Sequence, residues 1–230
     1  MKFLDEKVLI PLIFVVLGWV LAQGTAMVKD WWTTWKLKRG LLHELEDIKE
    51  QMCRVVLIYE RKIQIFSHKA IEPSASIEIH NYFFKQYYKE VFARLNRSQR
   101  LSYQLIHGCL DNLNKMNEDL GKFIVETYKE IKTTKDIDVI SGDFDSYGDR
   151  VVAIYKSAME LKWHIDYHLN NPKNPKLDNM GPMHESYLKF QAELHKRVQE
   201  IIEKAKKLKK EDFHKIYDPG FFDRSNRSNK

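Results

Sequence analysis

The first feature of the chain is a run of apolar residues from position 8 to position 28 that contains no charged side chain. As a helix this run would be about 31 Å long, which matches the hydrocarbon layer of a bilayer. A helix in the core of a soluble domain rarely stays apolar on every face over such a length. The pattern therefore predicts a transmembrane helix at 8–28, after a short extracytoplasmic N-terminus at 1–7.

A cleaved signal peptide is the main alternative for this segment. Val20, Leu21 and Ala22 resemble a small-residue cleavage site. The flank before the run carries Asp5 and Glu6 beside its lysines, and the run is longer than the apolar part of most signal peptides. We therefore expect the span to be retained.

Beyond position 40 the apolar residues recur at intervals of three and four, which is the spacing of an amphipathic helix. The stripe consists of Leu41, Leu45, Ile48, Met52, Val55 and Tyr59. It predicts a helix from about 30 to about 71 that can be continuous with the span. Pro73 then breaks the helix, because proline lacks a backbone N–H and restricts the residue before it.

The rest of the chain contains further helical patterns and two loops. A second helix is expected to run to about 114, and its positions 84, 87, 88, 91, 92 and 95 form one aromatic-rich face for the core. A third helix, at 111–132, can also be a continuation of the second. Loops are expected in TTKDIDVISGDFDSYGD and NPKNPKLDNMGP, with helices at 147–169 and 183–216.

These patterns predict an all-α fold class: one N-terminal transmembrane helix followed by an antiparallel bundle of about four long helices. No segment has the strict alternation of a half-buried strand. The bundle is expected to occupy 41–218, with a flexible tail at 219–230.

The segment 29–40, between the span and the bundle, carries the side chains of a membrane interface. Indole rings favour the headgroup layer, and Lys and Arg concentrate on the cytoplasmic side. The expected interfacial anchor consists of Trp31, Trp32, Trp35, Lys36, Lys38 and Arg39. The positive-inside rule then predicts a single-pass protein of the plasma (inner) membrane, with its N-terminus outside and its C-terminal domain in the cytoplasm.

Net charge narrows the classes of partner. The formal charge is +6 over 230 residues, a basic excess that suits an anionic membrane surface better than nucleic acid. A lysine-rich stretch at 204–215 is expected to be a solvated helix face, with anionic headgroups and nucleic acid as alternatives. Cys53 and Cys109 match no metal-binding spacing, and we expect two reduced, buried thiols.

Small residues recur every four positions within the span, at Gly18, Ala22 and Ala26. This spacing places them on one helix face, where two backbones can approach closely in lipid. The face is therefore a candidate for self-association into a homo-oligomer. The alternative is that Gly and Ala are common in any span.

Candidate chemistry is sparse. His164 and His168 lie one helical turn apart and could bind a metal, but nothing identifies further ligands. Asp143, Asp145 and Gly148 match three positions of a calcium loop, whereas Ile154 stands where a bidentate Glu is needed. No phosphate-binding or nucleophile motif occurs. We expect neither a metal nor another cofactor.

Two Arg–His pairs share one spacing, Arg61 with His68 and Arg100 with His107. This arrangement resembles the motif of the HEPN family of helical-bundle ribonucleases, in which the pair lies at a dimer interface and cleaves RNA. The resemblance covers only the spacing and the all-helical class. It implies catalytic roles for Arg100 and His107, and Leu101 departs from the polar residue usual after the Arg.

The leading hypothesis is therefore a non-enzymatic, oligomerising membrane effector or scaffold. Its expected partners are the lipid bilayer, further copies of itself and an unknown cytoplasmic protein. The alternative is a membrane-tethered HEPN-like ribonuclease.

Overall fold

The computed structural model describes residues 6–72, 78–133, 137–178 and 180–208, and within these ranges the chain is helical with no strand. The all-α class is confirmed. The elements are α1 (Glu6–Phe66), α2 (Tyr82–Val91), the 3₁₀ helix η1 (Phe92–Arg94), α3 (Arg97–Thr133), α4 (Ile137–Asn170) and α5 (Pro182–Lys206). The expected N-terminus at 1–7 and tail at 219–230 lie wholly or mostly outside the described residues.

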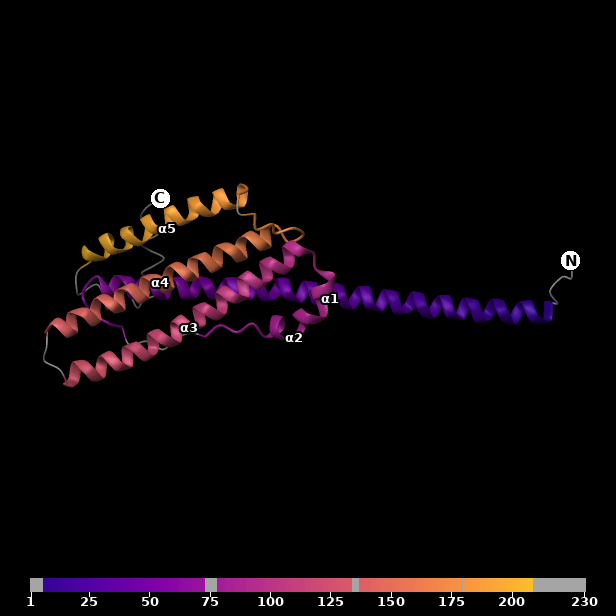
Figure 1. Ribbon diagram of the computed structural model, residues 1–230, viewed down its shortest axis with the longest axis horizontal. Coiled ribbons are helices and arrows are strands. Elements are labelled where there is room, and N and C mark those ends of the chain that lie inside the picture. The colour runs from indigo at the N-terminus through magenta and orange to yellow at the C-terminus, as the bar shows by residue number, and fades with distance from the viewer. Residues whose placement is uncertain (1–5, 73–77, 134–136, 179, 209–230) are drawn as a thin grey trace.

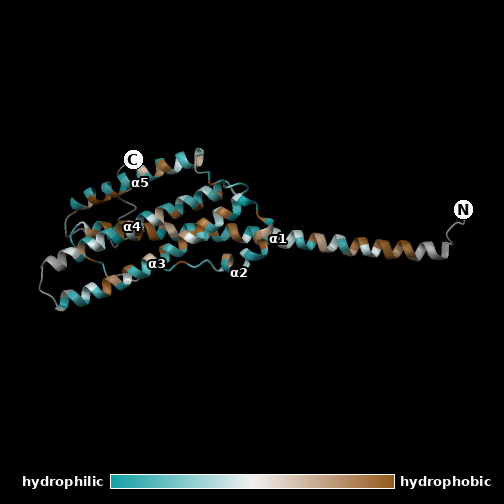
Figure 2. Ribbon diagram, in the orientation of Figure 1, coloured by the Kyte–Doolittle hydropathy of each residue, from teal (hydrophilic) through white to brown (hydrophobic). Residues whose placement is uncertain are grey.

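One helix, α1, runs without a break from the apolar N-terminal segment into the bundle, so the predicted continuity is confirmed. Its 61 residues correspond to about 90 Å of helix. We call residues 12–33 the stem, because every one of them is exposed. Figure 1 shows the stem projecting from one end of the bundle, and Figure 2 shows its apolar composition.

The remaining helices pack along the C-terminal half of α1 (Figure 1). The helix α4 packs against α1, α3 and α5 and runs antiparallel to all three. The next helix in the chain, α2, lies beside the point where the stem leaves, at the opposite end of the bundle from the end of α1. As a result α1 and α3, the first two long helices of the chain, run in the same direction. Consecutive long helices of an up-and-down bundle are instead antiparallel.

The core lies where the stripe on α1 predicted it. All six stripe residues from Leu41 to Tyr59 are buried. They meet apolar side chains from the other helices, including Ile106, Leu110, Leu113, Val151, Tyr155, Leu161, Leu194 and Val198. Phe92, which was expected on a core face, is instead 41% exposed, because the chain turns into η1 at that residue.

The expected second helix is interrupted, and α3 begins at Arg97. Asn96 and Gln99 form a reciprocal cap: Gln99 N donates to Asn96 Oδ1 at 2.9 Å, and Asn96 N donates to Gln99 Oε1 at 3.0 Å. This capping box starts a new helix. From there α3 passes Gly108 and Gly121 without a break, which confirms the continuation alternative.

The segment expected as a loop before 147 is mostly helix, because α4 already begins at Ile137. Tyr147 is fully buried and packs against Phe66, with 6.3 Å between ring centroids. An added Cβ at Gly148 would lie 2.1 Å from the Phe66 ring. Gly148 therefore accommodates an aromatic ring within a helix, and the loop expected over the residues before 147 was wrong from Ile137 onward.

Gly40 likewise leaves room for the ring of Phe83, because an added Cβ at Gly40 would lie 2.1 Å from that ring. We expect Gly40→Ala to displace α2 and to lower the free energy of unfolding by about 1–3 kcal/mol through overpacking. Gly108→Ala is the matched control, because a Cβ there meets no atom within 4 Å. It should instead stabilise α3 by about 0.5–1 kcal/mol. Urea titrations monitored by circular dichroism measure both, and equal effects would contradict the packing argument.

Candidate functional site

The stem is the feature that most constrains function. Among the described residues, one helix is long and apolar enough to cross a membrane, and its most apolar window has no buried residue. Exposed apolar patches of this size mark contacts with lipid or protein. A place within the core of the bundle is excluded, because no stem residue packs there.

The small-residue face of the stem is open in the single chain. Gly18, Ala22 and Ala26 are all exposed, and an added Cβ at Gly18 meets nothing within 4 Å. The neighbouring Thr25 satisfies its hydroxyl within the helix by donating to Leu21 O at 2.8 Å. The face is therefore free of obstruction.

Aromatic and cationic side chains alternate where the stem meets the bundle. The indoles of Trp32 and Trp35 stack with centroids 5.2 Å apart, and Trp31 lies 6.5 Å from Trp32. Lys36 lies over Trp32 and Arg39 over Trp35, each at 5.3 Å from the ring centroid. Such amphipathic groups suit a headgroup layer. Lys38 is half-buried and the other five anchor residues are exposed.

Three contacts fix α2 and η1 beside this junction. The carboxylate of Glu44 accepts hydrogen bonds from Phe83 N at 2.7 Å and Phe84 N at 2.9 Å, and so caps the start of α2. Burial raises the pKa of Glu44 above its usual value, although these two bonds work against the shift. At the other end, Arg94 donates to Asp30 at 2.6 Å. The chain from Phe83 to Arg94 therefore runs along α1 toward the stem.

The Arg100–His107 pair does not form a joint exposed site. The guanidinium of Arg100 donates to Leu95 O at 2.6 Å. The ring of His107 is buried and stacks on Phe84 with centroids 3.6 Å apart. Burial, with smaller contributions from Lys85 and His168, lowers the pKa of His107 from 6.5 to about 3. A neutral, enclosed imidazole gives the ribonuclease alternative no support.

Each residue of the second pair with that spacing contacts a residue of another segment. Arg61 faces Glu72 at 3.8 Å, whereas Nε2 of His68 lies 2.7 Å from the carbonyl oxygen of Ala205.

His168 belongs to the same buried region as His107. Its Nδ1 hydrogen-bonds Ser102 Oγ at 2.8 Å, and Tyr103 lies between the two imidazoles. Burial lowers the pKa of His168 and of His164 to about 4. Nε2 of His107 and Nε2 of His168 have no hydrogen-bond partner among the described residues. In the same ranges, no group of three His, Cys, Asp or Glu residues could hold a metal ion.

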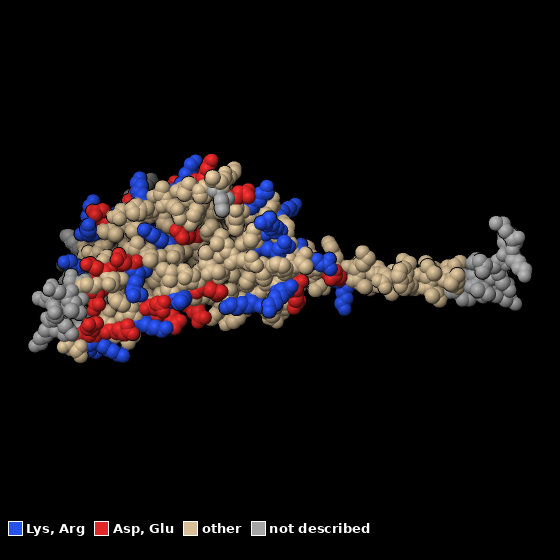
Figure 3. All heavy atoms as spheres, viewed as in Figure 1, with Lys and Arg blue, Asp and Glu red and all other residues tan. Residues whose placement is uncertain are grey.

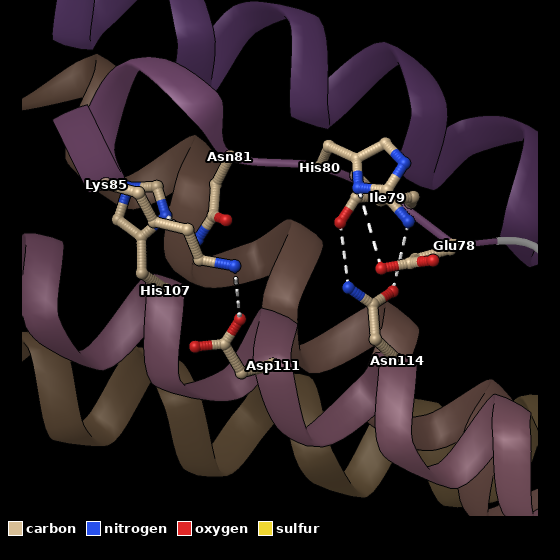
Figure 4. A network of polar contacts seen from close by, with 8 residues as sticks. All are labelled: Glu78, Ile79, His80, Asn81, Lys85, His107, Asp111 and Asn114. Carbon is tan, nitrogen blue, oxygen red and sulfur yellow. Dashed lines mark hydrogen bonds and ion pairs between the residues drawn. The ribbon is translucent and has the colours of Figure 1, made fainter.

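Residues 78–81 and the start of α2 are attached to α3 by a polar network (Figure 4). The amide of Asn114 donates to Ile79 O at 2.7 Å and accepts from Ile79 N at 3.1 Å. Asn81 Nδ2 lies 3.1 Å from Nδ1 of His107, and Lys85 pairs with Asp111 at 3.7 Å. The network satisfies the backbone N–H and C=O of Ile79, which belongs to no helix.

We expect Asn114→Ala to cost about 1–3 kcal/mol of unfolding free energy, because it removes both hydrogen bonds to Ile79, whose side chain is buried. Asn112→Ala is the control on the same helix, since Asn112 is exposed and its amide donates to the sulfur of Met116 rather than to the backbone of another segment. Chemical denaturation compares the two. A similar, small effect of both substitutions would contradict the role assigned to Asn114.

The described part of the lysine-rich stretch lies at the end of the bundle far from the stem. Ala205 contacts His68, just past the end of α1. From Trp35 to Phe66 the helix α1 is about 45 Å long. Within one chain these lysines therefore lie far from the Trp-rich junction, which weighs against contact with the same bilayer.

A cleft of about 390 Å³ opens between α3, α4 and the start of α5. Its lining combines apolar, aromatic and imidazole side chains, including Leu105, His164, Leu177, Met183, Tyr187 and Leu188. No sequence pattern predicts this cleft, because its lining residues come from distant segments.

Cys53 and Cys109 are both free thiols, and Cys53 is exposed, so its expected burial was wrong.

No protein-family model, no curated protein and no solved structure matches this chain.

Proposed function

We propose that this chain is a single-pass membrane scaffold that self-associates through its stem and presents a helical bundle to a cytoplasmic protein partner. The observation that carries the proposal is the continuity of α1. One helix supplies both an exposed apolar stem and the central stripe of the bundle core. A change in how stems pair would therefore reach the bundle without crossing a flexible linker.

The orientation follows from charge. Lys29, Lys36, Lys38 and Arg39 follow the apolar run directly, and positive flanks stay on the cytoplasmic side. The bundle would then lie in the cytoplasm, below the plasma (inner) membrane, with the N-terminus outside. The cleft at the start of α5 and exposed apolar residues such as Leu188 offer sites for a protein partner.

Self-association is tested by enlarging the small-residue face. The triple substitution Gly18→Ile, Ala22→Ile and Ala26→Ile should reduce an oligomer of the full-length chain in nanodiscs to monomers, because the backbones could no longer approach. Gly24→Ile is the matched control: it lies on the opposite face of the same helix and is equally open. Mass photometry gives the oligomeric state.

Two outcomes would contradict the proposal. A wild-type chain that is monomeric in nanodiscs would remove self-association through the stem. An oligomer that survives the triple substitution, or that Gly24→Ile disrupts equally, would place the interface elsewhere.

A further inference from the structure

We infer that the end of the bundle next to the stem docks onto the anionic headgroups of the bilayer that the stem enters. This inference rests on the proposed membrane span and adds a second, separate contact with lipid. The docking surface consists of η1, the start of α3 and the loop between α4 and α5. We call it the proximal surface.

The short helix η1 lies beside the Trp-rich junction along the length of α1. Asp30 precedes Trp31, so it lies on the stem side of the three tryptophans. Arg94 of η1 reaches Asp30 at 2.6 Å. If the tryptophans occupy the headgroup layer, η1 must lie at that depth as well. The short helix is therefore placed in contact with lipid by the geometry of the bundle itself.

The composition of η1 agrees with that location. Phe92 is 41% exposed, and it is not part of the cluster of buried core side chains. The guanidinium of Arg100 lies 5.0 Å from the ring centroid. An exposed aromatic ring beside cations is the combination that inserts between headgroups.

The loop between α4 and α5 extends the surface. Asn96 Nδ2 donates to Lys173 O at 2.7 Å, and Gln99 Nε2 donates to Pro172 O at 2.8 Å. These bonds hold the loop beside the start of α3. The side chains of Arg97, Lys173 and Lys176 remain exposed.

Charge identifies the partner as anionic lipid. Figure 3 shows Lys and Arg gathered at the end of the bundle from which the stem leaves, whereas both signs alternate along the rest of that face. Asp30 is paired with Arg94, and the loop and the end of α2 also carry the exposed acids Asp178 and Glu90. Each Lys or Arg close to an anionic surface strengthens binding by about fivefold.

Hydrogen exchange of the full-length chain in nanodiscs tests the inference. One set of nanodiscs contains phosphatidylcholine alone, and the other also contains phosphatidylglycerol. Amides of residues 92–98 and 172–178 should exchange at least about fivefold more slowly in the anionic nanodiscs, and amides of 200–206 should not change.

The variant Arg97→Glu, Lys173→Glu and Lys176→Glu should lose this lipid-dependent protection, because its proximal surface becomes acidic while the Asp30–Arg94 pair stays intact. The control Lys204→Glu, Lys206→Glu and Lys207→Glu makes the same change of charge at the far end of the bundle, and it should keep the protection.

Equal exchange in the two kinds of nanodisc, or equal behaviour of the two triple variants, would overturn the docking but leave the span untouched. Loss of the chain from the nanodiscs would overturn the span and the docking together. The retention of protein in the disc thus separates failure of the proposed function from failure of this inference.

Discussion

Lowering the pH from 7.5 to 5 is expected to destabilise the bundle by about 4 kcal/mol through His107 and His168, about 2 kcal/mol from each. Burial lowers their pKa values from 6.5 to about 3 and about 4. As the pH falls below 6.5, the unfolded chain binds protons that the folded chain does not. The stability is therefore fully present above pH 6.5 and is lost as the pH falls toward 4.

The surroundings of these two imidazoles explain why their pKa values are lowered. Lys85 adds positive charge near His107, and neither Nε2 has a hydrogen-bond partner in the described ranges. Glu44 works in the opposite direction, because burial raises its pKa above 4.5. The folded chain takes up that proton first as the pH falls, which offsets part of the loss at the acidic end of the range.

Urea denaturation at the two pH values measures the change. Replacing His107 and His168 together by Gln should remove about 4 kcal/mol of the dependence on pH, whatever the stability of the variant at pH 7.5. His164, whose pKa burial also lowers to about 4, should leave about 2 kcal/mol of that dependence in the variant. His195→Gln, at an exposed position, is the control and should preserve it. A double variant that responds to pH like the wild type would contradict the assignment to these two residues.

Leu45→Ala is expected to lower the free energy of unfolding by about 2–5 kcal/mol, because it leaves a cavity among fully packed side chains. Leu45 is fully buried in the middle of the stripe on α1. Leu57, on the same helix, is 57% exposed. Leu57→Ala removes the same atoms and should change stability by less than about 0.5 kcal/mol.

Thermal unfolding of the two leucine variants gives the comparison. A large effect of Leu45→Ala alone would show that the bundle depends on the C-terminal half of the same helix that carries the stem. If the two substitutions had equal effects, the core would not be organised around α1.

The periodicity of the sequence predicted the elements whose structure is decided locally. The unbroken apolar run became the stem, and the spacing from Leu41 to Tyr59 became the core stripe. The start of α3 was missed although Asn96 and Gln99 carry the signal of a capping box. The apolar positions 91, 92 and 95 continue the helical spacing up to the cap, so the periodicity alone predicts an unbroken helix there.

Other features depend on contacts that no local pattern contains. The helix α4 begins earlier than expected, in a segment rich in residues that favour loops. The ring of Phe66 packs on Gly148 in that part of α4, and such tertiary packing can override local propensity. The Asp30–Arg94 pair joins residues far apart in the chain. The burial of His107 likewise depends on Phe84 and Asn81, which belong to other segments.

The unbroken helix α1 also fixes how the bundle is rotated about the helix axis relative to the small-residue face of the stem. On a straight helix each residue turns the chain by about 100°, and the exposed residues Asp47 and Arg54 then fall within about 40° of the mean direction of Gly18, Ala22 and Ala26. Two copies joined along the stem would thus turn the same lateral side of their bundles toward each other. Two extra residues in 29–40 would rotate that side by about 200°. Pairing of the stems would therefore set which sides of the two bundles face each other, and not only how close the bundles lie.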